Sequence, residues 1–186
     1  MQALLEFDLQ LFELINQQWS NSFFDALLPY FRNKYIWAPL YIFIIVFLLV
    51  NYRNQGWKII LLSVLCVTLT DQISSSLIKP LIGRLRPCHE LADQIRLLVN
   101  CGAGYSFVSS HAANHFGFAV LISIFLGEKW KWVWPTALSW AVIVSYSQVY
   151  VGVHYPLDII GGALLGAVIG WSVSRLMNLA SRKRLN

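Results

Sequence analysis

The chain has 186 residues, which is enough for one domain. Hydrophobic residues make up 57% of it and charged residues only 12%, a balance that excludes an ordinary soluble globular protein. The formal net charge of +5 is distributed around long apolar runs, so we expect membrane lipids, and no nucleic acid, as partners.

The N-terminal region, residues 1–32, is predicted to be helical, and it lacks the basic start and unbroken apolar core of a cleaved signal peptide. Six apolar residues recur at helical spacing, with Glu6 and Glu13 on the opposite side. This pattern predicts an amphipathic helix in the membrane interface, and a helix packed against the bundle fits about equally well. Asp8 falls within the apolar face and agrees poorly with the interfacial interpretation. The six residues are Leu4, Leu5, Leu11, Phe12, Ile15 and Trp19.

Five later runs are apolar enough to cross a membrane, whose hydrocarbon layer of roughly 30 Å takes about 20 helical residues. We therefore predict an all-α, polytopic membrane bundle with about five to six transmembrane helices. It forms a single domain, 1–186, whose motif-bearing core spans 59–177. The five runs are Tyr35–Tyr52, Ile59–Ile78, Ala112–Leu126, Trp132–Tyr150 and Tyr155–Met177.

Charged residues divide unequally between the two ends of these runs. The connections 53–58 and 127–131, with the chain from residue 175 onward, hold eight basic residues and one acidic residue. The opposite ends hold six basic and seven acidic residues. By the positive-inside rule, the C-terminal "SRKRLN" faces the cytoplasm, and the connections 79–110 and 152–156 face outward.

The three cysteines fit this orientation. Cys88 and Cys101 lie in the outward connection, where an oxidising compartment lets them pair, and we predict a disulfide between them. Two free thiols are the alternative. Cys66 lies within an apolar run and is expected to be an inert small hydrophobic residue.

Three polar clusters fall on the predicted outward face: "KPLIGRLRP" at 79–87, "SFVSSH" at 106–111 and "SQVYVGVHYPLD" at 147–158. In the second, Ser109 or Ser110 is expected to cap a helix whose N–H groups point outward. In the third, Pro156 suits the first position of a helix, which places His154 just before it and Asp158 in its first turn. Asp158 can then hold one ring nitrogen of His154 and leave the other free.

Two helix N-termini, a Lys/Arg cluster and two histidines suit an anionic phosphate group. An oriented histidine can act as a nucleophile while a second one protonates the leaving oxygen. The i, i+4 spacing of His111 and His115 also suits metal ligation, but no third ligand accompanies them. We expect His115 to be a bundle histidine with satisfied hydrogen bonds, His89 to be a solvated loop residue, and Asp71 to bond neighbouring helices near the site.

These clusters resemble the type 2 phosphatidic acid phosphatase family, membrane relatives of the vanadium haloperoxidases. The pattern of that family is K-x6-RP, then PSGH, then SR-x5-H-x3-D. Order, spacing and membrane placement agree over roughly 59–177, whereas region 1–32 carries no motif of the family. The matching residues are Lys79, Arg86 and Pro87, then Ser109 and His111, then Ser147, His154 and Asp158.

The resemblance implies a role for each of these residues. His154 attacks phosphorus to form a phosphohistidine, Asp158 orients His154, and His111 protonates the leaving oxygen. No metal or other cofactor is implied. The phosphate oxygens are held by Lys79, Arg86 and Ser109.

Three positions depart from the family pattern. Val108 replaces its proline, and Ser110 replaces its glycine and adds a hydroxyl to the phosphate cradle. Gln148 stands where the family has a phosphate-binding arginine. Losing one charge-assisted hydrogen bond weakens binding by about 1.5–3 kcal/mol, roughly 10- to 100-fold. We expect Arg84 to replace the missing cation.

We therefore expect a metal-independent lipid phosphatase in a bacterial-type inner membrane, with its active site facing the periplasm or exterior. The short connections favour a lipid substrate over a bulky soluble one, and the candidates are undecaprenyl diphosphate, phosphatidic acid and phosphatidylglycerol phosphate. A lipid phosphotransferase and a non-catalytic lipid-phosphate binder are the alternatives. The oligomeric state is left open.

Overall fold

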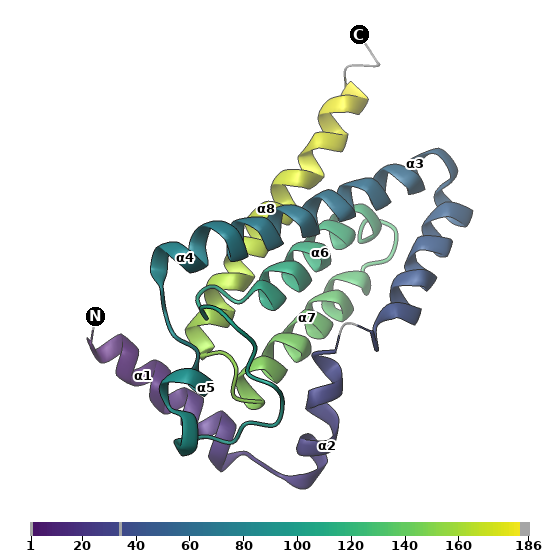
Figure 1. Cartoon of the computed structure of the whole chain (residues 1–186). Helices are drawn as coiled ribbons and strands as arrows, with labels where there is room; N and C mark the ends of the chain where they lie inside the picture. Colours follow the sequence, from purple (N-terminus) through teal and green to yellow (C-terminus); the bar gives the residue numbers. More distant parts are fainter. Residues whose placement is uncertain (1, 34, 183–186) are drawn as a thin grey trace.

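The computed structural model describes residues 2–33 and 35–182, except for the side chains of residues 53, 54 and 177–182. The described residues form helices and loops, with no strand among them, and the helices pack side by side (Figure 1). The predicted all-α fold is confirmed. Several charges that entered the orientation prediction lie outside the described part, namely Lys34, the side chains of Arg53 and Arg182, and the tail Lys183–Asn186.

Eight α-helices and three short turns follow one another in the described chain. The helices are α1 (Gln2–Glu13), α2 (Ser22–Phe31), α3 (Ala38–Gln72), α4 (Lys79–Ile82), α5 (Pro87–Glu90), α6 (Ser110–Leu126), α7 (Val133–Tyr150) and α8 (Pro156–Arg182). The turns are the π-helical segments η1 (Leu14–Gln18) and η2 (Ile73–Ile78) and the 3-10 turn η3 (Ala92–Gln94).

Helix α3 folds back on itself near Gly56 and so contains two apolar arms (Figure 1). In a straight helix, residues eight apart are separated by about 12 Å along the axis. A Cβ on Gly56 would instead overlap the carbonyl oxygen of Leu48, so the chain has reversed direction between them. The two runs that the sequence predicts on either side of residues 53–58 are therefore separate arms.

Two stretches of the described chain are long and apolar enough to cross a membrane, Gln55–Glu90 and Pro156–Leu176. Two shorter apolar helices, Ala38–Tyr52 and Ser110–Leu126, lie beside them. The count of five to six transmembrane helices stays a prediction. Large apolar side chains are exposed along the outer faces of α3 and α8, as expected for surfaces that contact lipid. They include Ile42, Phe43, Val50, Leu61, Val64, Leu164 and Val168.

The backbones of α6 and α8 touch along a stripe of glycines. A Cβ on Gly162, Gly166 or Gly170 would overlap the carbonyl oxygen of Ser109, Ala113 or Gly117, respectively. Small residues repeated every fourth position let two membrane helices approach this closely. The contact runs from the start of both helices, so their N-termini lie at the same end of the bundle.

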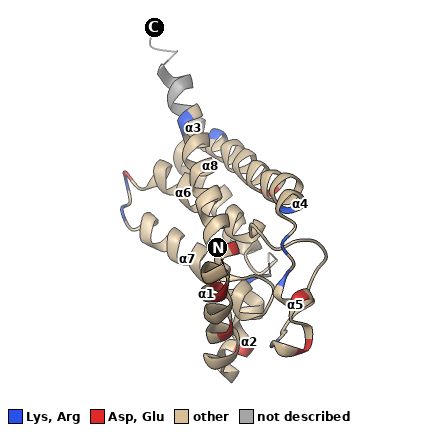
Figure 2. Ribbon diagram, turned by 90° about the vertical axis from the view of Figure 1, so that its left-hand side faces the viewer, with Lys and Arg blue, Asp and Glu red and all other residues tan. Residues whose placement is uncertain are grey.

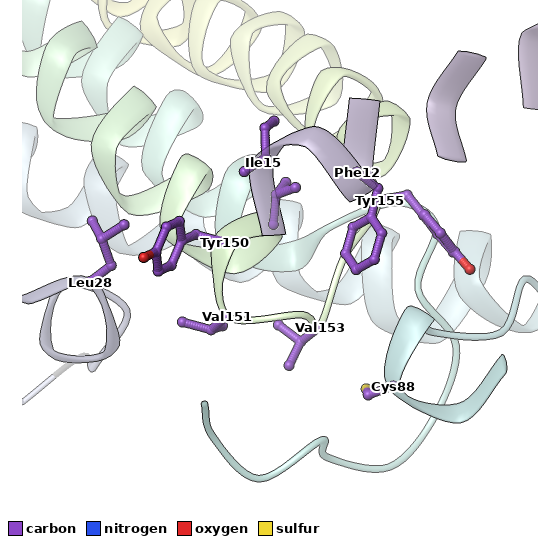
Figure 3. Close-up of a cluster of buried hydrophobic side chains, with 9 residues drawn as sticks. Phe12, Ile15, Leu28, Cys88, Tyr150, Val151, Val153 and Tyr155 are labelled. Atoms are coloured by element: carbon purple, nitrogen blue, oxygen red, sulfur yellow. The ribbon is translucent and has the colours of Figure 1, made fainter. Parts of the chain in front are cut away.

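The N-terminal region packs against that end of the bundle. Phe12 and Ile15 are buried in a cluster with the residues that follow α7, and Phe12 makes an edge contact with Tyr155 at 5.3 Å between ring centroids (Figure 3). Leu4 and Leu5 remain exposed. The interfacial prediction is therefore corrected in part, because the Phe12 side of α1 is bound to the bundle and only its first turns present apolar residues outward.

The two ends of the bundle differ in charge (Figure 2). Acidic residues gather on α1, α2 and α5, at the end where α6 and α8 begin, and basic residues of α4 and the following loop lie there too. Basic residues of α3, the α6–α7 connection and the described part of α8 lie toward the other end. The chain thus brings all three predicted polar clusters to one end.

Adding one methyl group to the glycine stripe should separate α6 from α8. Gly166→Ala would place a Cβ against the Ala113 carbonyl oxygen, and overpacking of this kind typically costs about 1–3 kcal/mol of unfolding free energy. We expect a lower melting temperature in detergent. Val168→Ala, on the exposed face of the same helix, is the matched control and should leave the melting temperature unchanged. An unaltered melting temperature for Gly166→Ala would contradict the close contact.

Candidate active site

The N-termini of α6 and α8 lie beside each other and form one wall of the site. The backbone N–H of Ser109 donates to the carbonyl oxygen of Asp158 at 3.0 Å, which ties the two helix starts together. Ser109 caps α6, because its hydroxyl accepts from the N–H of Ala112 at 3.4 Å, and Pro156 is the first residue of α8. Both helix starts are therefore where the sequence predicts them.

His154 and Asp158 form a buried pair at the start of α8. The Nδ1 atom of His154 lies 3.3 Å from Oδ2 of Asp158, and Oδ2 also accepts from the N–H of Tyr155 at 2.9 Å. This second bond closes the first turn of α8 like a capping box. Within the described chain, Nε2 of His154 makes no hydrogen bond, so it is the nitrogen left for chemistry.

Burial controls the charge of His154, which is only 2% exposed. Loss of hydration lowers the pKa of His154 to about 4, because a buried imidazolium is costly, although Asp158 acts in the opposite direction. Lys79 and Arg86 lie near enough for their positive charges to lower this pKa further. The imidazole is therefore neutral at pH 7 and can act as a nucleophile.

Arg84 contacts two carboxylates at once. Its guanidinium lies 3.0 Å from Oδ1 of Asp158 and 2.6 Å from Oδ2 of Asp8. Both of its terminal nitrogens are engaged in this way. The structure places Arg84 behind Asp158, the carboxylate that orients His154. A direct contact between Arg84 and phosphate, which would replace the family arginine, stays a prediction. Such a contact would require one of the two ion pairs to open.

Lys79 is the first residue of α4, and the loop after α4 carries Arg86. Arg86 precedes α5, and its Nε donates to the carbonyl oxygen of Gly104 at 3.3 Å. The predicted disulfide is present, and it joins Cys88 to Cys101 with their Cα atoms 5.9 Å apart. It holds the two sides of this loop together. Cys66 is buried and unpaired, as predicted.

His111 lies in the first turn of α6, near enough to His154 for their charges to interact. It borders a cavity of about 600 Å³ between α3, α6 and α7. The wall is polar near His111, where Asp71 and Ser110 line it, and apolar farther along. Ile45 and Val64 belong to the wall and are also exposed on the outer surface, so the cavity opens sideways from the bundle.

Asp71 bonds α3 to α6, as the sequence predicts. Its Oδ1 accepts from Nδ2 of Asn114 at 3.4 Å, and Asn114 in turn accepts from Thr70 at 2.6 Å. The expectation for His115 is only half right. Its Nδ1 lies 2.8 Å from the carbonyl oxygen of His111, but its buried Nε2 has no partner within the described chain and the residue lines the cavity.

The comparisons with known proteins agree with this geometry. The model of the PAP2 superfamily matches residues 57–182. The chain belongs to the PAP2 superfamily. It is a membrane phosphatase of that family, whose members hydrolyse phosphoester or diphosphate bonds.

Two curated relatives and one solved structure illustrate the range of the superfamily. The chain is 35% identical to the lipid A 4'-phosphatase of Bacteroides thetaiotaomicron, over 92% of this chain and 77% of the relative. It is 32% identical to an undecaprenyl-diphosphatase of Sulfolobus acidocaldarius, over 89% and 76% of the two chains. The crystal structure of a PAP2-type phosphatidylglycerolphosphate phosphatase from Bacillus subtilis shares the fold, with a TM-score of 0.75, 23% identity, and coverage of 96% and 88%.

Arg32 was not identified from the sequence as a PAP2 site residue. It stands at the C-terminal end of α2, outside the matched region, and its charge acts on both His111 and Arg86. The only indication in the sequence was that Arg32 lies at the end of a predicted helix that faces outward. Tertiary packing was needed to show which end of the bundle α2 covers.

Gln148 is the departure from the PAP2 pattern that the structure describes most sharply. Its side chain is completely buried, and neither amide atom has a hydrogen-bond partner within the described chain. The backbone carbonyl oxygen of Gln148 accepts from the N–H of His154 at 3.3 Å, so the residue is adjacent to the nucleophile candidate. Buried polar groups are rarely left unpaired, and Nε2 of this amide could donate to an incoming phosphate oxygen.

Replacing Gln148 with a residue of similar shape should separate its structural and binding roles. Gln148→Met removes the unpaired amide, so we expect a higher melting temperature, by the equivalent of about 1–3 kcal/mol. If the amide donates to phosphate, KM should rise about 10- to 100-fold. Ser145→Ala, which removes another buried unpaired group from α7, is the control and should raise stability without changing KM. An unchanged KM for Gln148→Met would exclude phosphate binding by this residue.

Proposed function

We propose that the chain removes a phosphate group from a membrane lipid at the site between α6 and α8, with His154 as the nucleophile. The observation that carries this proposal is the buried pair of His154 and Asp158, which leaves Nε2 unpaired beside Lys79, Arg86 and His111. Binding alone would not require an oriented, neutral histidine.

In the proposed reaction, Nε2 of His154 attacks phosphorus and the bond from phosphorus to the lipid oxygen breaks. His111 gives a proton to the leaving oxygen, and the phosphoryl group remains on His154. A water molecule then gives a proton back to His111 and displaces His154, which releases inorganic phosphate. Lys79, Arg86 and the starts of α6 and α8 stabilise the negative charge on the phosphate oxygens.

Other side chains complete the proposed phosphate site. We assign contacts with phosphate oxygens to the amide of Gln148 and to the hydroxyls of Ser109 and Ser110. The Ser110 hydroxyl lies 2.8 Å from the hydroxyl of Ser74 in η2, and this hydrogen bond holds it in place at the start of α6. Arg32 supplies a further positive charge near His111, where the family arginine is missing.

The cavity beside His111 supports a lipid as the substrate. It begins at the polar groups near His111 and continues along apolar side chains of α3 and α6, such as Val67 and Phe118. Its volume of about 600 Å³ is in the range of ligand sites. If the phosphate group of a lipid binds at the helix starts, the hydrocarbon chain of that lipid would lie in this cavity. The open side of the cavity would then face the membrane.

The relatives support several lipid classes. One is described as acting on lipid A and another on undecaprenyl diphosphate. A panel of a lipid A type phosphosugar lipid, undecaprenyl diphosphate, phosphatidic acid and phosphatidylglycerol phosphate therefore ranks the substrates by phosphate release. Release of free phosphate also separates hydrolysis from transfer, because a phosphotransferase would place the group on a second lipid.

We infer that the site faces the periplasm or exterior of a bacterial-type inner membrane, with the C-terminal end in the cytoplasm. The disulfide between Cys88 and Cys101 lies at the end that carries the site, and disulfides persist on the oxidising side of a membrane. The excess of basic residues at the opposite end supports the same orientation.

Removing the nucleophile tests the mechanism. His154→Gln should lower the rate of phosphate release by on the order of 10⁴-fold or more, in detergent without added metal. His89→Gln replaces an exposed histidine of α5 and is the control that should retain activity. A folded His154→Gln protein with normal turnover would overturn the proposed mechanism.

Filling the cavity tests the proposed position of the lipid chain. Val67→Trp places an indole in the apolar part of the cavity, so KM should rise by about tenfold or more for long-chain lipid phosphates, because their buried apolar contacts are lost. Turnover of a small water-soluble phosphate monoester should be unaffected. Val50→Trp, on the exposed outer face of α3, is the matched control. Equal KM values for wild type and Val67→Trp with every long-chain lipid would contradict this placement.

A further inference from the structure

Asp8 occupies a position that the catalytic residues described above do not explain. It lies in α1, outside the region that the PAP2 model matches, and it is only 1% exposed. A buried carboxylate is costly unless charges or hydrogen bonds compensate it. Burial raises the pKa of Asp8 above its ordinary value, although the hydrogen bonds from Arg84 and from the N–H of Leu157 act in the opposite direction. These partners therefore offset part of the cost of burying its charge.

Both oxygens of Asp8 are engaged at the start of α8. Oδ1 accepts from the N–H of Leu157 at 2.8 Å, and Oδ2 lies 2.6 Å from the guanidinium of Arg84. Leu157 is in the first turn of α8, whose N–H groups have no partner within the helix. Asp8 thus binds α8 between His154 and Asp158, the two residues of the catalytic pair.

Arg84 connects Asp8 to that pair. The other terminal nitrogen of Arg84 lies 3.0 Å from Oδ1 of Asp158, while Oδ2 of Asp158 faces His154. The guanidinium also lies 4.1 Å from the centre of the Tyr155 ring, and the Tyr155 hydroxyl donates to Glu90 at 2.8 Å. Arg84 is therefore held on three sides in one orientation.

We propose that Asp8 is a positioning residue for catalysis, which acts through Arg84 to set the orientation and charge of Asp158 behind the nucleophile. The role rests on the proposed function of His154. One guanidinium is shared by two carboxylates, so Asp158 keeps part of its negative charge for the imidazole. Without Asp8, Arg84 would pair with Asp158 alone and would neutralise it more completely.

Loss of Asp8 should affect the step in which positive charge develops on His154. Its ring becomes positive as it forms a bond to phosphorus, and a less negative Asp158 stabilises that state less. The same loss disfavours protonation of free His154. The charged and titratable groups that act on His154 from the surrounding elements are Asp158, Arg86, Lys79 and His111. In this proposal Arg84 and Asp8 act on it through Asp158.

The first test is Asp8→Asn, which keeps the shape and the acceptor for Leu157 but removes the charge. We expect kcat for phosphate release to fall on the order of tenfold, with KM within about twofold of wild type. The acid limb of the kcat/KM–pH profile should move to lower pH, because free His154 is harder to protonate. A purely structural role would lower the active fraction without moving this limb. Glu6→Gln, an exposed carboxylate on the same helix, is the control.

The second test changes Arg84 itself. Arg84→Lys keeps one positive charge, but an ammonium lacks the planar fork that spans two carboxylates. The positioning role predicts a lower kcat with unchanged KM, whereas a direct contact to phosphate predicts a higher KM. This variant also gives the answer if Asp8→Asn fails to fold.

His154→Gln in the same assay distinguishes a failure of the positioning role of Asp8 from a failure of the proposed function of His154. Wild-type kcat and an unmoved acid limb in folded Asp8→Asn, together with an inactive His154→Gln, would overturn the positioning role alone. Turnover by His154→Gln would overturn the proposed function and the role of Asp8 with it. A fall in kcat with the shifted limb in Asp8→Asn, and an inactive His154→Gln, is the expected result.

Discussion

The backbones of α6 and α8 touch along Gly162, Gly166 and Gly170, and the geometry of the site depends on this contact. Because the two helices approach so closely, Ser109 can donate from the start of α6 to the carbonyl oxygen of Asp158 at the start of α8. The positive ends of two helix dipoles then point into one space. Larger residues in the stripe would separate the helix starts, and with them the phosphate cradle and the His154–Asp158 pair.

Charge around this space is arranged in layers. His154 is buried and neutral, Asp158 lies behind it, Arg84 lies behind Asp158, and Asp8 of α1 lies behind Arg84. The outermost carboxylate belongs to a helix outside the matched region of the PAP2 superfamily. The chain has Gln148 in place of the family arginine, and Arg84 is bound to carboxylates in the described structure.

One side of the N-terminal helix fits the packed alternative that its sequence leaves open, and contact of the other side with the membrane interface stays a prediction. Phe12, Ile15 and Asp8 bind the bundle, while Leu4 and Leu5 stay exposed. Helical spacing identifies the apolar face, but it does not distinguish contact with protein from contact with lipid, because both environments favour apolar side chains. Asp8 disagreed with an interfacial helix for a physical reason, since its partners Arg84 and Leu157 are supplied by distant parts of the chain.

The sequence by itself determined the all-α fold, the start of α8 at Pro156, the pairing of His154 with Asp158 and the disulfide between Cys88 and Cys101. These features depend on composition, on local helix-capping rules or on cysteine placement in one connection. Tertiary structure alone decided the partners of Arg84, the unpaired amide of Gln148, the nearness of Arg32 to His111 and the cavity beside His111. Each of these joins residues far apart in the chain, and their distances follow from how the helices pack, which no local pattern encodes.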